Sequence, residues 1–352
     1  MEQIKIVVDA YGGDNAPSEV VLGTKKAIED IKDLKVVLTG KKEVLEQLLV
    51  ENSIDADRVE ILDAQDVISN DDTPTVAIKQ KTESSLVKAF ELLKKDETVK
   101  GLVSAGSTGA VLTGAFLKVG RIKGVSRPVL APVIPTVKGT PVILTDSGAN
   151  MDCKPENLVH FALMANKYAQ TMFGIEKPRI ALLSVGTEDH KGNDLVKKTF
   201  PYMKQLDINF VGNMEARDLL SGDFDVVVAD GFAGNVALKT CEGTLKALLG
   251  ILKDDIKSHT SSKIGYLFMK GTFKRLKSKF DYNAYGGSPF LGVNKIVIKC
   301  HGSSKAESFY QSIKQAYNLS QSNMIEELST SVNNLDIKFE DWLCLNKKFW
   351  MI

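Results

Sequence analysis

The sequence predicts an α/β protein with three layers, in which helices cover both faces of a largely parallel sheet. Short β-branched runs alternate with helical patterns along most of the 352 residues, and such alternation predicts βαβ units with right-handed crossovers. Most of these runs are apolar throughout, as in strands that are covered on both faces. We expect one α/β unit over residues 1–330, with lobes around a central cleft, because no repeat or low-complexity linker divides it.

Strands are expected where short aliphatic and β-branched runs lie between turn residues. The predicted strands are Ile4–Val8, Lys35–Thr39, Val59–Leu62, Gly101–Ser104, Val129–Ile134, Val142–Thr145, Arg179–Val185, Asn209–Val211, Asp225–Ala229 and Lys295–Lys299. The predicted helices are Ser18–Ile31, Pro74–Lys95, Pro155–Phe173, Gly192–Gln205, Asn235–Lys257 and Ser303–Tyr317. The helix from Pro74 is expected to be long and to begin after the capping residues Asp71, Asp72 and Thr73.

The composition is that of an ordinary globular protein. It is 43% hydrophobic and 25% charged, and the formal net charge of +1 gives no overall attraction to nucleic acid. The four cysteines lie far apart without a CxxC pair, which argues against a disulfide framework or a zinc site and favours a reducing cytoplasm. We expect no secretion signal and no membrane span, because no apolar run approaches about 20 residues.

Four polar loops connect predicted strands to helical patterns, and each is rich in Gly, Asn, Ser or Asp. They are DAYGGDNAP at Asp9–Pro17, SAGSTGA at Ser104–Ala110, DSGANMDCKP at Asp146–Pro155 and DGFAGNVALK at Asp230–Lys239. Such loops present backbone N–H groups, and often a helix N-terminus, to an anion. Because the carboxyl ends of parallel strands lie at one edge of a sheet, the four loops predict one polar cleft that handles a phosphate or carboxylate.

Two residues beside these loops are candidates for catalysis. Lys191, in the segment GTEDHKGND, stands just before a predicted helix, where it either helps to hold an anion or is a solvated loop lysine. Asn235 opens a predicted helix, and it either caps that helix or aims its amide at a developing oxyanion, beside the backbone N–H groups of Gly234 and Asn235 itself. The residue types leave both alternatives open.

Two further segments have the composition of phosphate contacts. Ser107, Thr108 and Gly109 lie in SAGSTGA, which forms either a cradle or a tight turn, but the segment lacks the lysine of a P-loop. In HGSS, His301 could contact phosphate. Alternatively, the segment is structural and Ser303 caps the following helix. GxGxxG, HExxH and GxSxG are all absent.

Several acidic residues stand where predicted strands end: Asp9, Asp14, Asp146, Asp152 and Asp230. Carboxylates at such positions would either bind Mg²⁺ or accept hydrogen bonds from the loop backbone. We favour the second interpretation, because loops rich in glycine need side chains that hold them in place.

A basic segment covers residues 256–280 and holds seven Lys or Arg but no acid. Apolar residues recur in it near helical spacing, which is typical of an amphipathic helix at a membrane surface, at an acidic partner, or packed on the body or a second subunit. The contact candidates are Lys263, Leu267, Phe268, Lys270, Lys274 and Arg275. The tail at 331–352 carries both tryptophans, Trp342 and Trp350, and has no predicted catalytic role.

Taken in order, these motifs resemble the bacterial phosphate acyltransferase family of phospholipid synthesis, the PlsX type. The matching segments are DAYGGDNAP, SSLVKA, SAGSTGA, GRIKGVSRP, DSGANMDCKPENLVHFA, GTEDHKGN, VGNMEARD, ADGFAGNVALKT, DYNAYGGSPFLG and HGSS. They extend from about residue 4 to residue 317. Each match is weak alone, but the ordered set is specific, and the tail lies outside it.

The resemblance implies a reaction in which inorganic phosphate attacks the thioester of a long-chain acyl carrier protein. The products are acyl phosphate and free carrier protein, and the acyl phosphate then feeds a membrane acyltransferase acting on glycerol 3-phosphate. The resemblance also implies a fold related to phosphotransacetylases and isocitrate-type dehydrogenases. The resemblance further implies a homodimer that works without metal or nicotinamide cofactor, located in the cytoplasm with peripheral contact to the inner face of the membrane.

Under this resemblance the candidate residues take defined roles. Lys191 neutralises phosphate or the oxyanion, and Asn235 donates to the oxyanion. Ser107, Thr108 and Gly109 cradle phosphate, with Asn150, Gly234 and His301 as further contacts. Two other hypotheses are a metal-dependent decarboxylating dehydrogenase of the related fold and a scaffold that binds carrier protein without catalysis.

Overall fold

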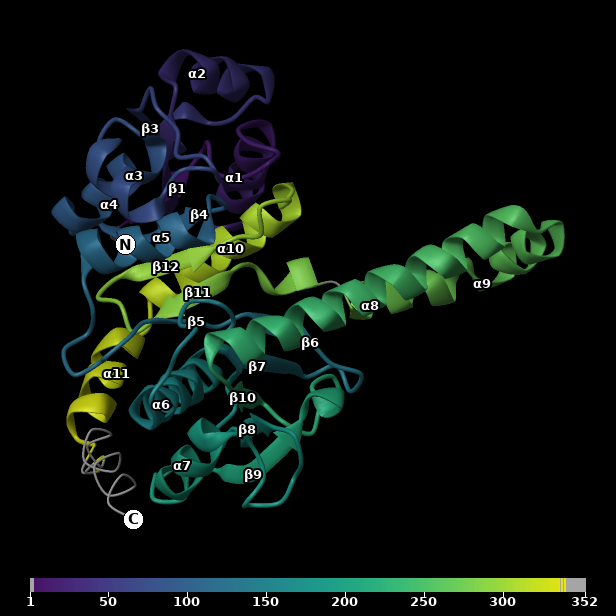
Figure 1. Cartoon of the computed structure of the whole chain (residues 1–352). Helices are drawn as coiled ribbons and strands as arrows, with labels where there is room; N and C mark the ends of the chain where they lie inside the picture. Colours follow the sequence, from purple (N-terminus) through teal and green to yellow (C-terminus); the bar gives the residue numbers. More distant parts are fainter. Residues whose placement is uncertain (1–2, 281, 336, 338, 340–352) are drawn as a thin grey trace.

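The protein has two lobes, each built on its own sheet (Figure 1). The computed structural model describes residues 3–280, 282–335, 337 and 339. Among these described residues, no helix combines the length and the apolar character that crossing a membrane would require. Trp342 and Trp350 of the predicted tail lie outside them.

The first lobe contains a seven-stranded sheet. Its strands lie in the order β3 (Val59–Asp63), β2 (Leu34–Gly40), β1 (Ile4–Asp9), β4 (Val99–Ser104), β12 (Ile296–Lys299), β11 (Ser288–Leu291) and β5 (Val129–Leu130). The strands from β3 to β12 are parallel, and β11 is antiparallel to both of its neighbours. Consequently β1, β4 and β12 are adjacent and end at the same edge.

Helices cover both faces of this sheet. Successive residues of a strand point to opposite faces, and β1 shows this, because Ile6 and Val8 belong to one buried cluster and Val7 to another. The first cluster includes α1 (Ser18–Asp30) and α10 (Ala306–Ser320), and the second includes α4 (Ser85–Lys95) and α5 (Thr108–Gly114). Two smaller helices, α2 (Lys42–Glu51) and α3 (Pro74–Gln80), complete this lobe.

The second lobe contains a five-stranded sheet in the order β6 (Val133–Pro135), β7 (Pro141–Thr145), β10 (Val226–Val228), β8 (Ile180–Ser184) and β9 (Phe210–Glu215). Only β6 is antiparallel to its neighbour. One face packs on α6 (Pro155–Phe173) and α7 (Asp194–Met203), and the other packs on the first turns of α8 (Gly231–Ser258). The strands β7, β10 and β8 are therefore adjacent and parallel, with helices on both faces.

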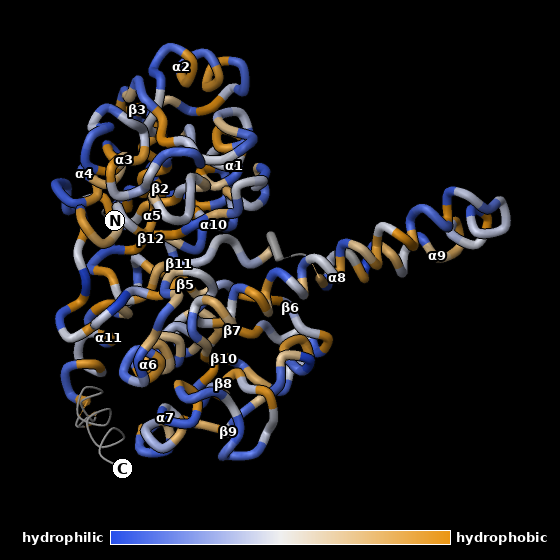
Figure 2. The backbone as a smooth tube through the Cα atoms, viewed as in Figure 1, coloured by the Kyte–Doolittle hydropathy of each residue, from blue (hydrophilic) through white to orange (hydrophobic). Residues whose placement is uncertain are grey.

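A helical hairpin extends away from both lobes. It consists of α8 and α9 (Thr260–Lys279), which contact each other along their lengths (Figure 1). Figure 2 shows apolar and polar residues alternating along the hairpin. The last helix, α11 (Met324–Asn333), packs against α6.

The three-layer α/β prediction is confirmed, but two predicted elements are divided. The helix expected over Pro74–Lys95 is two helices, α3 and α4, because Ser84 accepts a hydrogen bond from the backbone N–H of Val87 and starts a new helix there. The strand expected over Val129–Ile134 is two strands in different sheets, separated by Ala131 and Pro132. Proline lacks the N–H that a continuous ladder requires.

Other differences concern element ends and omissions. The helix expected from Asn235 begins four residues earlier, at Gly231, and the basic segment 256–280 covers the end of α8, the turn at His259 and all of α9. Apart from short 3-10 and π segments, the predictions lacked four elements, α2, α5, β11 and α11. The strand β11 is short and contains Pro289, which disfavours a strand prediction.

Candidate active site

Three loops of the first lobe pack into one polar surface. They follow β1, β4 and β12, and hydrogen bonds tie the first to the third: the backbone N–H of Asp14 donates to the carbonyl of Gly302 at 2.8 Å. A Cβ at Gly13, where φ is +98°, would lie 2.8 Å from the Cβ of Ala105 in the second loop. This close packing requires glycine, and it holds the three loops as one unit, called the cradle below.

Asp9 supports the cradle from inside. Its carboxylate is buried and accepts from the Ser104 hydroxyl at 2.7 Å and from the backbone N–H of Tyr11 at 3.3 Å. Burial raises the pKa of Asp9, and the hydrogen bonds from Ser85 and Ser104 oppose that rise. Asp9 therefore has the loop-holding role that we favoured for the strand-end acids. Among the residues that the structure describes, no three His, Cys, Asp or Glu side chains are grouped to hold a metal ion.

Ser107, Thr108 and Gly109 lie where β4 passes into α5. Ser107 precedes the helix and its side chain makes no capping hydrogen bond, while Thr108 and Gly109 form the first turn. All three residues are half-buried. A Cβ at Gly109 would lie 2.8 Å from Pro74 Cγ, so this turn packs closely against α3. The first-turn N–H groups of such a helix have no intrahelical partners.

His301 stands on the third loop of the cradle. The backbone N–H of Ser303 donates to His301 Nδ1 at 3.2 Å, so the neutral ring carries its proton on Nε2. Burial lowers the pKa of His301, and the charge of Lys239 lowers it further. A neutral imidazole with Nε2–H is thus available as a hydrogen-bond donor.

The second lobe presents the loops after β7 and β10, which are joined through Asp146. Its buried carboxylate accepts from the backbone N–H groups of Leu130, Ser147, Ala149 and Asn150. Burial raises the pKa of Asp146 to about 6, against the effect of these hydrogen bonds. Asp146 therefore also acts as a support for the loop backbone.

Asn150 and Gly234 have structural positions in this lobe. The two amide hydrogens of Asn150 have acceptors in the Pro128 carbonyl at 2.8 Å and the Asp146 carboxylate at 2.9 Å. The backbone N–H of Gly234 donates to the Asp230 carbonyl at 3.0 Å, which corrects the expectation that this N–H faces an oxyanion. A Cβ at Gly234 would lie only 1.9 Å from the Asp146 carbonyl, so glycine permits α8 to approach the β7 loop.

Asn235 does not cap α8. Asp230 is the cap, because its carboxylate accepts from the N–H groups of Phe232 and Ala233 at 2.9 and 2.8 Å. Asn235 lies in the second turn, half-buried, with its side-chain oxygen 3.6 Å from where a Cβ at Gly148 would be. The capping alternative is excluded, and the amide lies beside the β7 loop.

Lys191 lies on the loop after β8, which neighbours β10 in the sheet. Its backbone N–H donates to the Glu188 carbonyl at 3.0 Å, and its Cγ lies 3.1 Å from where a Cβ at Gly186 would be. Asn193 caps the next helix by accepting from the Val196 N–H. The sheet order thus places the Lys191 loop next to the start of α8, and the Lys191 side chain is exposed.

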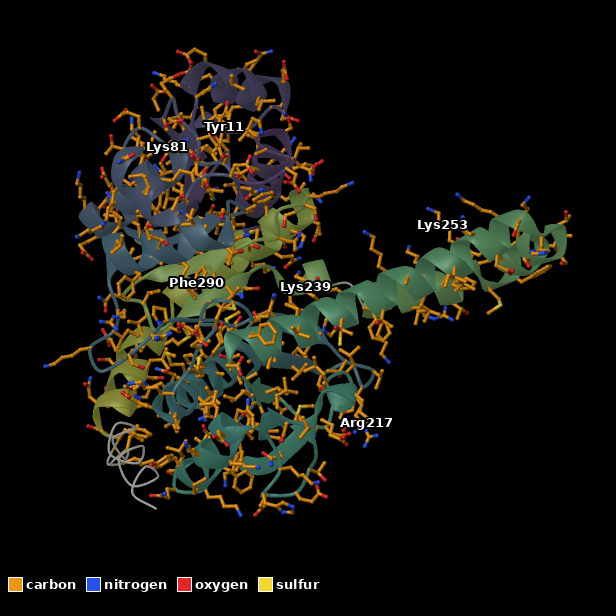
Figure 3. All side chains as sticks on the ribbon, in the orientation of Figure 1. Tyr11, Lys81, Arg217, Lys239, Lys253 and Phe290 are labelled. Atoms are coloured by element: carbon orange, nitrogen blue, oxygen red, sulfur yellow. The ribbon has the colours of Figure 1, made fainter. Side chains whose placement is uncertain are left out.

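The two lobes approach each other at Lys239, one helical turn after Asn235. Figure 3 shows Lys239 near the base of α8, between the lobes. Its charge acts on both His301 and Lys299 of the cradle. Lys239 also pairs with Glu242 at 2.7 Å. The cradle and the start of α8 are therefore neighbours, and the region between them is called the cleft below. Lys239 is a residue that the sequence interpretation missed.

Lys299, at the end of β12, was also missed. Its side chain is 8% exposed, and its ammonium donates to the carbonyl of Cys300 without an ion pair to any residue that the structure describes. Burial lowers the pKa of Lys299, while Asp14 and Asp9 are near enough to raise it. A buried cation without a paired anion is costly. The available signal was a lysine closing the otherwise apolar strand IVIK.

Fold and loops together define a two-lobed α/β protein whose lobes each present loops rich in hydrogen-bond donors at the carboxyl ends of parallel strands. The structure is similar to a phosphotransacetylase from Streptococcus pyogenes, with a TM-score of 0.59, 17% identity and coverage of 91% of this chain and 94% of that one. It is also similar to a branched-chain phosphotransacylase from Enterococcus faecalis V583, with a TM-score of 0.57, 16% identity and coverage of 90% and 99%. At these identities the likeness shows the fold.

The family follows from the sequence. Residues 4–327 match the family described as "Fatty acid synthesis protein". A phosphate acyltransferase from Caldanaerobacter subterraneus subsp. tengcongensis is 46% identical over 329 residues, covering 94% of this chain and 97% of the relative. One from Clostridium tetani is 44% identical over 333 residues, covering 95% and 99%. The chain belongs to this family of phosphate acyltransferases, as the ordered motifs predicted.

Proposed function

We propose that this protein transfers the acyl group of a long-chain acyl carrier protein thioester to inorganic phosphate. The products are acyl phosphate and free carrier protein, and the acyl phosphate feeds a downstream glycerol-3-phosphate acyltransferase in phospholipid synthesis. The observation that carries the proposal is the buried Lys299 of the cradle, which lies near enough to Lys239 on α8 for their charges to interact, one helical turn from Asn235. Family membership supports the same reaction class.

The reaction makes modest demands on the protein. A phosphate oxygen attacks the thioester carbonyl carbon, the C–O bond forms, and a tetrahedral oxyanion appears. The C–S bond then breaks, and the carrier thiolate leaves and takes a proton from water. Phosphate is already an anion at neutral pH, so positioning and oxyanion stabilisation matter more than a strong base.

In this proposal the cradle holds phosphate. Lys299 supplies a buried ammonium at the end of β12, and His301 offers Nε2–H from the loop that follows. Further hydrogen-bond donors are the hydroxyl groups of Ser107 and Thr108 and the backbone N–H groups of this turn, including that of Gly109. Buried charge is worth more than exposed charge, because the local dielectric is lower.

The second lobe stabilises the oxyanion. The Asn235 amide is free from capping and lies beside the β7 loop. Lys191 brings positive charge from the loop after β8, and Lys239 brings it from the next turn of α8. Asn150 and Gly234 position these groups and do not contact substrate, because their own hydrogen bonds and packing hold the loops together.

The α8–α9 hairpin is proposed to bind the inner face of the cell membrane, so that the protein is cytoplasmic and peripherally attached. Leu267 is 71% exposed and Phe268 is 87% exposed, and Lys263, Lys270, Lys274 and Arg275 surround them on α9. Apolar side chains flanked by cations suit an anionic lipid surface. Packing against the second subunit of a homodimer is the other use for this surface, and the proposed active form is a homodimer.

The first test is phosphate-dependent release of free carrier protein from palmitoyl-acyl carrier protein in the presence of EDTA. The expected result is release of carrier together with an equal amount of acyl phosphate. Release that requires a divalent metal and a nicotinamide would favour the dehydrogenase hypothesis. Carrier binding without any release, by folded dimeric protein, would favour the scaffold hypothesis.

A further inference from the structure

One stretch of the chain is basic and free of acids. Between Glu97 and Asp146 the sequence contains no Asp or Glu but six Lys or Arg. Three of these cations, Arg121, Lys123 and Arg127, stand within seven residues on the loop between η2 (Ala115–Val119) and β5, and all three are exposed. A chain with a net charge of +1 thus concentrates positive charge locally.

These three cations have no carboxylate partners in the part of the chain that the structure describes. Arg121 and Arg127 donate instead to backbone carbonyls, of Ser126 and Asp152 respectively. Lys118, one turn earlier, pairs with Glu91 at 3.2 Å and is neutralised. The loop therefore presents positive charge that no neighbouring acid cancels.

Apolar side chains accompany the cations. Phe116 is 42% exposed, and the Arg121 guanidinium lies 4.9 Å from its ring centroid, so the ring and the cation form one surface. Leu117 beside it is also exposed. An open recess of about 390 Å³ is lined by Phe116 and residues 120–125. Exposed aromatic and arginine side chains around a recess are typical of protein interfaces.

The loop is rigidly held. Ile122 and Val125 are buried, and the backbone N–H of Ile122 donates to the Gly292 carbonyl at 3.0 Å. Gly120 and Gly124 both have φ of +88°, a conformation that favours glycine and fixes the path of the loop. The exposed cations thus stand on a preorganised base, which lowers the entropy lost on binding.

Both ends of the loop lead to the cleft. On one side, α5 and η2 connect it to Thr108 of the cradle, over a helical length of about 15–18 Å. On the other side, the Pro128 carbonyl accepts from Asn150 and the Leu130 N–H donates to Asp146. A partner docked here would lie one helix length from the reacting groups.

We propose that residues 116–127 form the docking surface for the acidic acyl carrier protein. This inference rests on the proposed function and goes further. It assigns carrier-protein binding to residues 116–127 and membrane binding to the α8–α9 hairpin. The occupant is a protein with a negative surface, since the unpaired cations need anionic partners and the exposed apolar residues need burial. A carrier docked here would direct its thioester arm along α5 into the cradle.

The test compares two matched double charge reversals: Arg121→Glu with Lys123→Glu on the loop, and Lys263→Glu with Lys270→Glu on the hairpin. Turnover is measured with palmitoyl-acyl carrier protein and with palmitoyl-pantetheine, which lacks the protein. The loop pair is expected to raise KM for the carrier substrate by at least about tenfold and to leave turnover of palmitoyl-pantetheine and KM for phosphate unchanged. The hairpin pair is expected to lower binding to phosphatidylglycerol vesicles and to leave the carrier KM unchanged.

Three outcomes would overturn the inference: the hairpin pair raises the carrier KM, the loop pair weakens only vesicle binding, or the loop pair lowers turnover of both substrates equally in folded protein. Direct binding of free carrier protein provides a readout that does not need catalysis. If the wild type turns over neither substrate, the proposed function fails, while loss of carrier binding in the loop pair still supports the docking surface. Lys123→Glu alone, which removes no hydrogen bond or ion pair among the described residues, serves if the double variant fails to fold.

Discussion

The two ends of α8 have opposite environments although they belong to one continuous helix. Its first turns pack on the β7 loop and the five-stranded sheet, and Gly231, Gly234 and Ala237 are the buried positions there. Farther along, Leu248 and Ile251 are exposed, and this half of α8 extends away from both lobes (Figure 1). Small residues allow backbone to approach backbone at the cleft, whereas large apolar residues in the hairpin remain available to a surface outside the subunit. Each end can be altered separately.

The largest effect is expected at the cleft end, for Gly234→Ala. The added Cβ would lie 1.9 Å from the Asp146 carbonyl, so either α8 or the β7 loop must move. We expect loss of activity together with destabilisation of about 3 kcal/mol or more, as for severe overpacking. Thermal unfolding and turnover measure the two effects, and a variant with wild-type stability would contradict the close approach.

The next effect is chemical and concerns Asn235→Ala. If its amide donates to the oxyanion, turnover should fall about 100- to 1,000-fold without loss of stability, because the side chain caps nothing. Lys191→Ala should lower turnover in the same direction. Folded Asn235→Ala and Lys191→Ala proteins that each keep near wild-type turnover would remove both residues from the proposed mechanism.

Across the cleft, Lys299→Met tests whether the buried cation holds phosphate. Methionine keeps the length and the packing but removes the charge. We expect KM for phosphate to rise about 10- to 100-fold while KM for the carrier substrate stays constant. A more stable variant with an unchanged KM for phosphate would show instead that the buried charge destabilises the protein and does not bind phosphate. Lys295→Met, on the same strand region but paired with Glu97 at the surface, is the control.

At the far end of the hairpin, Leu267→Glu with Phe268→Glu should weaken binding to phosphatidylglycerol vesicles about tenfold or more, because both exposed side chains lose their apolar character. Turnover of palmitoyl-pantetheine should be unchanged. Vesicle flotation measures the first effect. Intact vesicle binding with a change from dimer to monomer in light scattering would assign this surface to the second subunit.

The smallest effect is expected for Gly250→Ala, in the exposed half of α8. A Cβ there meets nothing within 4 Å, so the substitution only raises helix propensity. We expect stabilisation of about 0.5–1 kcal/mol, seen as a higher midpoint in urea. Together with Gly234→Ala, it would show that a Gly→Ala substitution lowers stability at one end of this helix and raises it at the other.

Much of the fold could be predicted because strand and helix patterns are local. The helix Pro155–Phe173 agrees with α6 at both ends, since proline opens it and glycine follows it. The division of 129–134 between two sheets could not be predicted, because it depends on which distant strands pair with each half. The start of α8 was misplaced because Asn235 and Asp230 are both good caps, and only the hydrogen bonds of Asp230 distinguish them.

The site was predicted unevenly for a similar reason. Loop composition indicated SAGSTGA and HGSS, whose strands β4 and β12 are adjacent in one sheet, and DGFAGN, which follows β10 in the other sheet. It could not show that both amide hydrogens of Asn150 have acceptors within the protein. It also could not indicate Lys239 and Lys299, because a lysine on a helix or at a strand end is ordinary until burial and the opposite lobe are known.

The length of α8 sets the distance between the candidate active site and a membrane bound at the hairpin. From Asn235 to Ser258 the helix rises about 35 Å, which exceeds the roughly 30 Å hydrocarbon thickness of a bilayer. The proposed membrane contacts Leu267 and Phe268 lie on α9 about 12 Å back from the hairpin tip, so a membrane bound there would stand off from Asn235 by roughly 20 Å. An acyl chain activated in the cleft would have to be handed across that gap, so the standoff favours transfer to a neighbouring enzyme over direct partition into lipid.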